Sequence, residues 1–383
     1  METNTYCLSE IAEICDSKRI PLSAMERVKR QGRYRYYGAQ GVIDYVDYYL
    51  FDGEYLLIAE DGENLKSLKQ NIAQVVSGRF WVNNHAHIIQ TNSKCRLRYL
   101  YYLINSMDIS GYITGSAQPK LSQANMKKIE LELPDILTQD KILSVLCTVD
   151  KKIEENEKIN KNLQLQAQTL YTAWFETFEP FNGVVPGSWQ QITLGDIAEI
   201  KTNSFNPQKN PDVVIEHYSI PAFDEKKYPV FEYASGVKSN KYILSTNSVM
   251  ISKLNPDTKR VWRPLCLSDL AVSSTEFIIF EAYNPKHKDF VYSVIDSQSF
   301  TDWMCSHTTG STNSRQRTTP ATTLNYNLWL PDDASMEKFL NTVTPMYDLI
   351  AQNLSQNQEL ITLRDSLLPK LMSGELDVSN IDV

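Results

Sequence analysis

Two long stretches of the chain place apolar residues at alternating spacings of four and three. The first runs from Ile142 to Trp174, and the second from Phe339 to Leu371. Glycine is absent from both stretches, and a spacing that averages 3.5 residues is typical of the buried seam of a coiled coil. The pattern therefore predicts two long helices, each on the order of 50 Å at 1.5 Å per residue. Gly374 is placed to end the second helix.

The two seams carry asparagine at matching places. Their central members are Ile153, Asn156, Asn160 and Leu163 in the first helix and Ile350, Asn353, Asn357 and Leu360 in the second. In an antiparallel pair Asn156 would oppose Asn357, and Asn160 would oppose Asn353. A buried asparagine fixes the register of a coiled coil at some cost in stability. We therefore predict that the helices pair within one chain; the alternative is that each packs on its own domain with its asparagines in solvent.

The rest of the chain alternates apolar runs with turn residues, and this pattern occurs twice. YLLIA (55–59), HIIQ (87–90) and IELELP (129–134) read as strands, while SVMISKL (248–254) and FIIF (277–280) repeat the first two. LSEIAEI (8–14) resembles LGDIAEI (194–200). We predict an α/β (α+β) fold of two duplicated domains in a pseudo-two-fold arrangement, joined by the antiparallel coiled coil. The segments are a domain over 1–135, a helical spacer over 136–180, a linker over 181–190, a second domain over 191–331, a second spacer over 332–376 and a tail over 377–383.

Composition limits the class of protein. The chain has 383 residues, is 42% hydrophobic and has a formal net charge of −8, as an ordinary globular protein does. It lacks an apolar run long enough for a membrane span and a secretory signal, so we expect a cytoplasmic protein without a membrane partner. The six cysteines form no CxxC pair and are expected to be reduced.

Signatures of catalysis are weak. The sequence has no P-loop, GxGxxG, HExxH or GxSxG motif. His85 and His87 would share one face of a strand near Cys95, but zinc would need a fourth ligand, so a structural role is favoured and no metal is predicted. Asp212, Glu225 and Lys227 have the outline of a PD-(D/E)xK nuclease core, in which two carboxylates hold Mg²⁺. A stand-alone Mg²⁺-dependent nuclease is the alternative function; a charged surface loop is favoured instead.

Basic residues mixed with aromatic ones give a stronger signal. Arginine and lysine neutralise phosphates, tyrosine adds phosphate hydrogen bonds, and a glutamine can read an adenine edge. Solvated surface charge is the alternative at each cluster, but recurrence in both halves favours DNA. The candidates are Arg30, Arg33, Tyr34, Arg35, Tyr36, Tyr37 and Gln40 in one run, Lys94 and Arg96 nearby, and Lys253, Lys259, Arg260, Arg263, Arg315 and Arg317 in the second half.

The chain resembles the specificity (S) subunit of type I restriction–modification systems over nearly its whole length. TGSAQPKLSQANMKKIELELP (114–134) carries the resemblance most strongly, through Gly115, Gln118, Leu121 and Ser122. The second half has a degenerate counterpart of this stretch, TGSTNSRQR (309–317). The last helix ends in LLPKLMSGEL (367–376), which matches the ending common in S subunits. The family often has Glu-Gln after the proline that ends the last strand; here Thr138-Gln139 and Ser335-Met336 stand there. The loop adds Gln118 and Lys120 to the candidate DNA contacts.

The resemblance implies a non-catalytic DNA reader. Each target-recognition domain would read half of a bipartite site in double-stranded DNA, and the coiled coil would set the gap. Two methyltransferase subunits would dock around the chain, and ATP-dependent translocase–nuclease subunits would join for restriction. No cofactor is expected in this chain; S-adenosylmethionine, ATP and Mg²⁺ would be bound by the partners. A coiled-coil scaffold with no DNA role is a third possibility, in which the Arg-Tyr run would be dispensable.

Overall fold

The computed structural model describes residues 1–67, 70–115, 118–309 and 316–382, and they form two compact units. The first unit contains Met1–Lys152 and Leu360–Val383, and the second contains Ile153–Glu359. Two long helices, α6 (Ile136–Phe175) and α11 (Asp333–Ser373), each contribute to both units. No helix in the described part of the chain is long and apolar enough to cross a membrane.

The first unit is built on a six-stranded sheet with the order β2-β7-β5-β6-β3-β4, in which β3 and β6 are parallel. A separate pair, β1 with β8, joins the start of the chain to the strand that precedes α6. The bounds are β1 (Asn4–Cys7), α1 (Leu8–Ile11), β2 (Ala12–Ile14), α2 (Ala24–Lys29), β3 (Gln31–Gly38), β4 (Gly41–Val46), β5 (Phe51–Ala59), α3 (Asn64–Ser67), β6 (Ala73–Val82), β7 (Ala86–Thr91), α4 (Leu97–Ser106), α5 (Gln123–Met126) and β8 (Glu130–Leu133).

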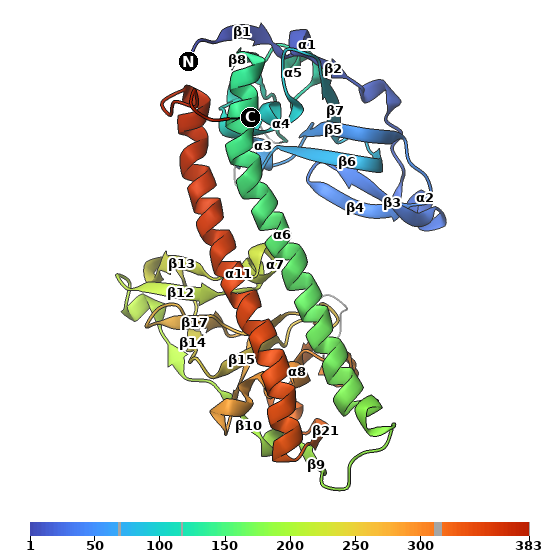
Figure 1. The fold of residues 1–383 in the computed structure, drawn as a ribbon, viewed down its shortest axis with the longest axis vertical. Helices are drawn as coiled ribbons and strands as arrows, with labels where there is room; N and C mark the ends of the chain where they lie inside the picture. Colours follow the sequence, from blue (N-terminus) through green and yellow to red (C-terminus); the bar gives the residue numbers. More distant parts are fainter. Residues whose placement is uncertain (68–69, 116–117, 310–315, 383) are drawn as a thin grey trace. The chain divides into compact units, whose positions relative to one another are not determined.

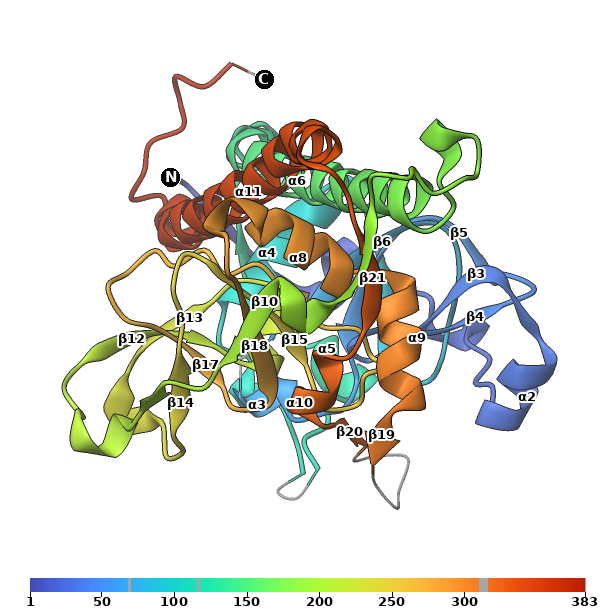
Figure 2. The same cartoon turned by 90° about the horizontal axis from the view of Figure 1, so that it is seen from below.

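The second unit has a four-stranded sheet, β10-β18-β15-β16, and a five-stranded sheet, β11-β14-β17-β12-β13. Helix α8 covers the first of these on the side of the long helices (Figure 2). The bounds are β9 (Gln190–Thr193), β10 (Ala198–Lys201), β11 (Ser204–Phe205), β12 (Val214–Tyr218), α7 (Ile220–Lys226), β13 (Val230–Tyr233), β14 (Lys241–Ile243), β15 (Ser248–Ser252), β16 (Val261–Trp262), β17 (Ala271–Ser274), β18 (Phe277–Ala282), α8 (Lys288–Ile295), α9 (Gln298–Ser306), β19 (Thr308–Thr309), β20 (Arg317–Thr318), α10 (Pro320–Thr323) and β21 (Asn327–Leu330).

The duplication predicted from sequence appears in the structure as a set of strands, here called the frame, that both units share. The pair β9 with β21 repeats β1 with β8, and β10-β18-β15-β16 repeats β2-β7-β5-β6. The two units differ in the strands that are added to this frame. In the first unit β3 and β4 extend the same sheet, whereas in the second unit the added strands make a sheet of their own. The two halves thus share a scaffold but present different surfaces.

Both long helices begin at a Pro-Asp pair that stops the preceding strand. Asp135 accepts a hydrogen bond from the Thr138 N–H at 2.8 Å, and Asp332 accepts one from Ser335 at 2.8 Å. These bonds satisfy backbone donors that a first helical turn leaves free. At the other end of α11, Gly374 adopts a φ of 76°, as the sequence predicts for a residue that ends a helix.

The coiled coil is antiparallel, and the predicted asparagine layers face each other (Figure 1). The Asn156 amide donates to Asn357 at 2.8 Å and to Gln356 at 2.7 Å, and Asn353 donates to Asn160 at 2.8 Å. Asn156, Asn353 and Asn357 are buried. Arg364 interrupts the apolar seam of α11 and forms an ion pair with Asp150 of α6 at 2.8 Å.

Replacing Asn156 alone by leucine should destabilise the chain by about 1–3 kcal/mol, because the Asn357 carbonyl would lose its donor inside the seam. The double variant Asn156→Leu, Asn357→Leu should be at least as stable as the original chain, since an apolar layer replaces a polar one. Urea unfolding of the original chain, both single variants and the double variant gives the coupling free energy between Asn156 and Asn357. Lys158→Leu, at an exposed position of the same helix, is the control. A double variant that is less stable to urea than either single variant would contradict the pairing of Asn156 with Asn357.

Candidate nucleic-acid interface

The clearest candidate surface is the hairpin of β3 and β4. It forms the edge of the first unit's sheet opposite β2, next to α2 (Figure 1). The Ser23 hydroxyl begins the helix before it by accepting a hydrogen bond from the Glu26 N–H, and the Ser23 N–H donates to the Glu26 carboxylate at 2.8 Å. Helix α2 then ends at Arg30, and β3 carries the predicted Arg-Tyr run. Alternation along a strand sends successive side chains to opposite faces, so the run divides into an exposed and a buried set.

Arg33 and Arg35 are the exposed cations of this hairpin. Arg33 donates to the Tyr34 hydroxyl at 3.0 Å, and Arg35 donates to the Ser77 carbonyl at 2.9 Å. Each guanidinium also lies over a tyrosine ring, at 5.1 Å and 5.6 Å from the ring centroid. No carboxylate among the described residues is paired with either, so both positive charges remain available to an anion.

A cluster of tyrosines surrounds these arginines. Tyr34 lies 5.2 Å from Tyr49, which stacks on Tyr48 at 5.1 Å, and Arg79 lies over Tyr49 at 4.9 Å. The hydrogen bond from Arg33, aided by the charge of Arg79, lowers the pKa of the Tyr34 hydroxyl, which makes it a better donor to a phosphate. Sequence reasoning missed Tyr48, Tyr49 and Arg79. The aromatic density of YVDYYLF (45–51) was the available signal for the two tyrosines.

Other members of the predicted run serve the fold. Tyr36 and Tyr37 are buried in the core, where Tyr36 accepts a hydrogen bond from the Leu22 N–H at 2.8 Å. Arg30 is paired with Asp47 at 3.0 Å, and its guanidinium lies over the Trp81 ring. Gln40 is exposed at the turn between β3 and β4. Of the predicted run, the exposed surface therefore consists of Arg33, Tyr34, Arg35 and Gln40, with Arg30 neutralised at its edge.

The second predicted cluster of the first unit is tied to other parts of that unit. Arg96 forms two hydrogen bonds of 2.7 Å with Asp140 at the start of α6, and Lys94 lies over the Tyr6 ring at 4.8 Å. A carboxylate that uses both of its oxygens on one guanidinium neutralises it. Arg96 thus joins the strand-rich part of the first unit to α6, while Lys94 is exposed and has no carboxylate partner among the described residues.

Gln118 and Lys120 stand at the end of a tight turn. The backbones of Thr114 and Lys120 exchange two hydrogen bonds of 2.8 Å, and Gln118 is exposed. Gly115 has a φ of 87°, and a side chain there would come within 2.2 Å of the Gln118 carbonyl oxygen, so only glycine fits. Lys120 is exposed but lies 3.3 Å from Glu60. The turn therefore presents Gln118 and the partly neutralised Lys120 to solvent.

The candidate basic residues predicted in the second unit are mostly neutralised. Every arginine described there is held by carboxylates: Arg260 by Asp224, Arg263 by Asp289 and Asp348, and Arg317 by Glu276, at 2.6–3.1 Å. Lys253 is half-buried, and Arg315 lies outside the described residues. These positions hold the domain together, in contrast to Arg33 and Arg35.

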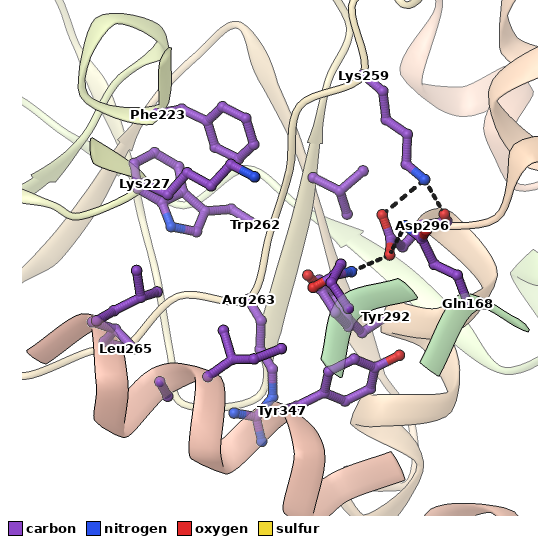
Figure 3. Close-up of a pocket in the computed structure, with 15 residues that line it drawn as sticks. Gln168, Phe223, Lys227, Lys259, Trp262, Arg263, Leu265, Tyr292, Asp296 and Tyr347 are labelled. Carbon is purple, nitrogen blue, oxygen red and sulfur yellow. Dashed lines mark hydrogen bonds and ion pairs between the residues drawn. The ribbon is translucent and has the colours of Figure 1, made fainter. Parts of the chain in front are cut away.

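Lys259 and Arg263 line a cavity of about 370 Å³ inside the second unit (Figure 3). The Lys259 ammonium lies 2.9 Å from Asp296, which also accepts hydrogen bonds from Gln164 and Gln168 of α6. Trp262 and Tyr347 form part of the apolar wall. These ion pairs and hydrogen bonds join α6, α8 and α11 to the segment on either side of β16.

The histidines of the first unit take separate roles. We predicted that His85 and His87 share a strand face, and this is wrong: β7 begins at Ala86, so His85 lies outside it and pairs with Asp61 at 2.7 Å. His87 is buried, with Nδ1 2.6 Å from Asp16 and Nε2 2.8 Å from the Leu121 carbonyl. Both of its nitrogens are used by the protein, which leaves neither for a metal. No group of three potential ligands occurs among the described residues.

The residues of the proposed nuclease core do not form one. Asp212 lies in a turn before β12, whereas Glu225 is in the last turn of helix α7 and Lys227 caps that helix with a φ of 50°. All three are exposed. The nuclease core needs its second carboxylate and its lysine near the first carboxylate at a metal, and a short helix end with solvated charges does not supply that arrangement. The observed geometry fits the charged surface loop favoured from sequence.

Asp16 should make the first unit sensitive to acid. Burial opposes its ionisation, but hydrogen bonds from His87 and from the Ile88 N–H outweigh burial and lower the pKa of the Asp16 carboxyl. A carboxylate with a lowered pKa in the folded state stabilises the protein above its unfolded-state pKa of about 3.9. That contribution is lost as the pH falls through the lower folded-state pKa.

Asp16→Asn should therefore cost about 3 kcal/mol of unfolding free energy near neutral pH, and the difference from the original chain should shrink below about pH 4. Urea unfolding between about pH 3 and pH 7 measures both. Asp52→Asn is a matched control, because the pair of Asp52 with Arg79 is exposed and should contribute under about 1 kcal/mol. An equal loss for both variants would show that burial of the Asp16 pair is unimportant.

Comparison with known proteins agrees with this geometry. Residues 1–165 match the family described as the type I restriction modification DNA specificity domain. A putative type I restriction enzyme specificity subunit of Haemophilus influenzae is 35% identical over 36% of this chain and 35% of its own length. The MjaIX specificity subunit of Methanocaldococcus jannaschii is 27% identical over 74% of this chain and 70% of its own. Residues 1–165 therefore form a type I restriction–modification DNA specificity domain.

The solved structures extend the likeness of fold to the full length. The S subunit of a type I restriction–modification system from M. genitalium matches with a TM-score of 0.59 and 14% identity, over 97% of this chain and 96% of that one. The Arg-Tyr hairpin lies within the residues that match the DNA specificity domain. The alignment with the Haemophilus relative spans about a third of that protein, whereas the Methanocaldococcus relative is matched over most of its length.

Proposed function

We propose that this chain is a specificity subunit, that each of its halves reads one half of a bipartite site in double-stranded DNA, and that the coiled coil sets the gap between them. Two methyltransferase subunits would dock around it in the cytoplasm, and translocase–nuclease subunits would join for restriction. S-adenosylmethionine, ATP and Mg²⁺ would be supplied on those partners. The observation that carries the proposal is the duplicated strand frame, which supports a different added surface in each half.

The division of labour follows from how DNA is recognised. Phosphate contacts give affinity without sequence information, whereas contacts with base edges give specificity. In the first unit Arg33 and Arg35 retain free positive charge on an exposed hairpin, beside tyrosine hydroxyls and Gln40. In the second unit the described arginines are neutralised, so the five-stranded sheet would recognise its half-site with fewer arginine contacts. We expect the two halves to differ in salt dependence as well as in sequence.

A domain exchange tests the proposal. Replacing residues 191–331 by the corresponding domain of a relative with a different target should change one half of the methylated sequence and leave the other half and the gap as they were. The measurement is a map of methylated adenines in host DNA that carries the chimera together with its methyltransferase subunits. A chimera that folds and methylates but alters both halves, or neither, would contradict the modular reading.

A further inference from the structure

His87 is a buried histidine whose two ring nitrogens both face oxygen acceptors. It is 1% exposed, with Nδ1 2.6 Å from the Asp16 carboxylate and Nε2 2.8 Å from the Leu121 carbonyl. A carboxylate and a carbonyl oxygen can only accept, so both nitrogens must donate for both bonds to form. Neutral imidazole has only one N–H. The geometry therefore requires the doubly protonated, cationic ring.

The surrounding charges support that cation. Asp16 accepts further hydrogen bonds from the Ile88 N–H at 2.9 Å and from Gln123 at 3.1 Å. Glu60 lies 3.9 Å from His87 Nδ1, and Arg19 bridges the two carboxylates, at 2.8 Å from Glu60 and 3.3 Å from Asp16. Lys120 pairs with Glu60 at the rim. The carboxylates of Asp16 and Glu60 thus face His87, while the two other cations contact those carboxylates.

The carbonyl that His87 holds belongs to the base of the Gln118–Leu121 segment. Leu121 is fully buried, and its N–H donates to the Glu60 carbonyl at 2.8 Å. The Gly62 N–H donates to the Pro119 carbonyl at 3.3 Å, and Lys120 is paired with Thr114 through the backbone. His87 therefore fixes, through Leu121, the segment that presents Gln118 and Lys120 to solvent. Without its second proton, Nε2 and the carbonyl oxygen would meet as two lone pairs at 2.8 Å.

We propose that His87 is a positioning residue for recognition of the first half-site: as a cation it holds the Gln118–Leu121 segment in its DNA-reading position, and loss of its Nε2 proton releases that segment. The inference rests on the proposed function, since it takes the exposed end of this segment to contact DNA. It adds a pH dependence that is confined to one half of the bipartite site. Histidine is the side chain whose charge changes in the neutral range.

The second unit offers a matched control. His217 is also largely buried and carboxylate-paired, with Nδ1 2.7 Å from Glu232. Its Nε2 is buried without a hydrogen-bond partner among the described residues. Burial lowers the pKa of His217, so this ring tends to be neutral. His217 thus shares the environment of His87 but fixes no carbonyl through its second nitrogen.

The test measures discrimination by the assembled methyltransferase complex between about pH 6 and pH 9. The probes are the duplex that carries the methylated site and two duplexes with one base pair changed, in the first or in the second half. Discrimination by the original chain at the first half-site should fall about tenfold as the pH rises, and at the second it should be unaffected. H87Q should show the low value at every pH, whereas H217Q should behave as the original chain.

The outcomes separate this inference from the proposed function. Suppose that the original complex discriminates against base changes in both halves of the site, and that H87Q shows the same discrimination and pH profile at the first half. The positioning role of His87 is then overturned, while the proposed reading of one half-site by each domain stands. If changes in the first half of the DNA have no effect at any pH, the proposed function itself fails. Should H87Q not fold, ¹⁵N-histidine NMR of the original chain decides, because a single protonated nitrogen on His87 at neutral pH would overturn the proposal.

Discussion

One heptad inserted into each arm should lengthen the recognised DNA site by about three base pairs while leaving both half-sequences unchanged. Seven residues add about 10 Å to a helix, and the DNA helix advances about 34–36 Å in 10–10.5 base pairs. The insertions belong after Lys152 and after Glu359, at the boundaries of the two compact units, where Ile153 and Leu360 are expected to face each other. Contacts inside each unit are then retained. A whole heptad also keeps the apolar seam in phase.

Mapping methylated adenines in host DNA measures the new gap directly. The matched control inserts the same heptad after Lys152 alone, so that the pair of Asp150 with Arg364 and the pair of Asn156 with Asn357 can no longer both form; this should destabilise the coiled coil and abolish methylation. If the complex with both insertions methylates sites with the original gap, the coiled coil does not determine the spacing between half-sites.

Replacing Arg33 and Arg35 together by alanine should weaken DNA binding by the assembled complex about 10- to 100-fold at physiological salt. The reason is that both guanidinium groups are exposed and have no carboxylate among the described residues, so their full charge is available to DNA. Two lost phosphate contacts would make the salt dependence of binding shallower by about two in its logarithmic slope. If the arginines contact bases instead, discrimination at the first half-site should relax.

Arg96→Ala is the matched control for this double variant. Arg96 is an exposed arginine of the same unit, but Asp140 already neutralises it through two hydrogen bonds. Binding titrations at several salt concentrations should therefore show little change for Arg96→Ala. If Arg96→Ala weakens binding as much as the double variant does, the ion pairs seen here do not decide which arginines reach DNA. If the double variant Arg33→Ala, Arg35→Ala binds DNA as the original chain does, the hairpin is not part of the interface.

Local patterns were sufficient to predict the frame of the molecule. The alternation of spacings of four and three identified α6 and α11, and the position of Asn156 and Asn160 relative to Asn353 and Asn357 predicted the antiparallel register. Short β-branched runs located β5, β7, β15 and β18. These predictions succeed because side-chain periodicity in a helix or strand is a property of neighbouring residues and needs no knowledge of distant ones.

Which residues of the Arg-Tyr run are exposed and which are buried was harder to predict from sequence. Tyr34 and Tyr36 lie two positions apart in one strand, yet Tyr34 is partly exposed and Tyr36 is fully buried. The β3–β4 register is regular from Tyr34 to Tyr36, and both rings pack on one cluster with Val46 and Trp81, so they share a face of the sheet. Sequence alone gives the alternation of faces but not how deeply each position of a face is covered.

The sequence by itself determined the duplication, the two heptad seams and the family resemblance, all of which are patterns of residue type along the chain. Only the tertiary structure decided which charges are available. Arg260 is neutralised by Asp224, Arg263 by Asp348 and Arg96 by Asp140, and each partner lies dozens of positions away. The same holds for His87, whose two ring nitrogens face Asp16 and the Leu121 carbonyl, both distant in sequence. Ion pairs and buried hydrogen bonds depend on distances in space, which folding sets and local sequence does not.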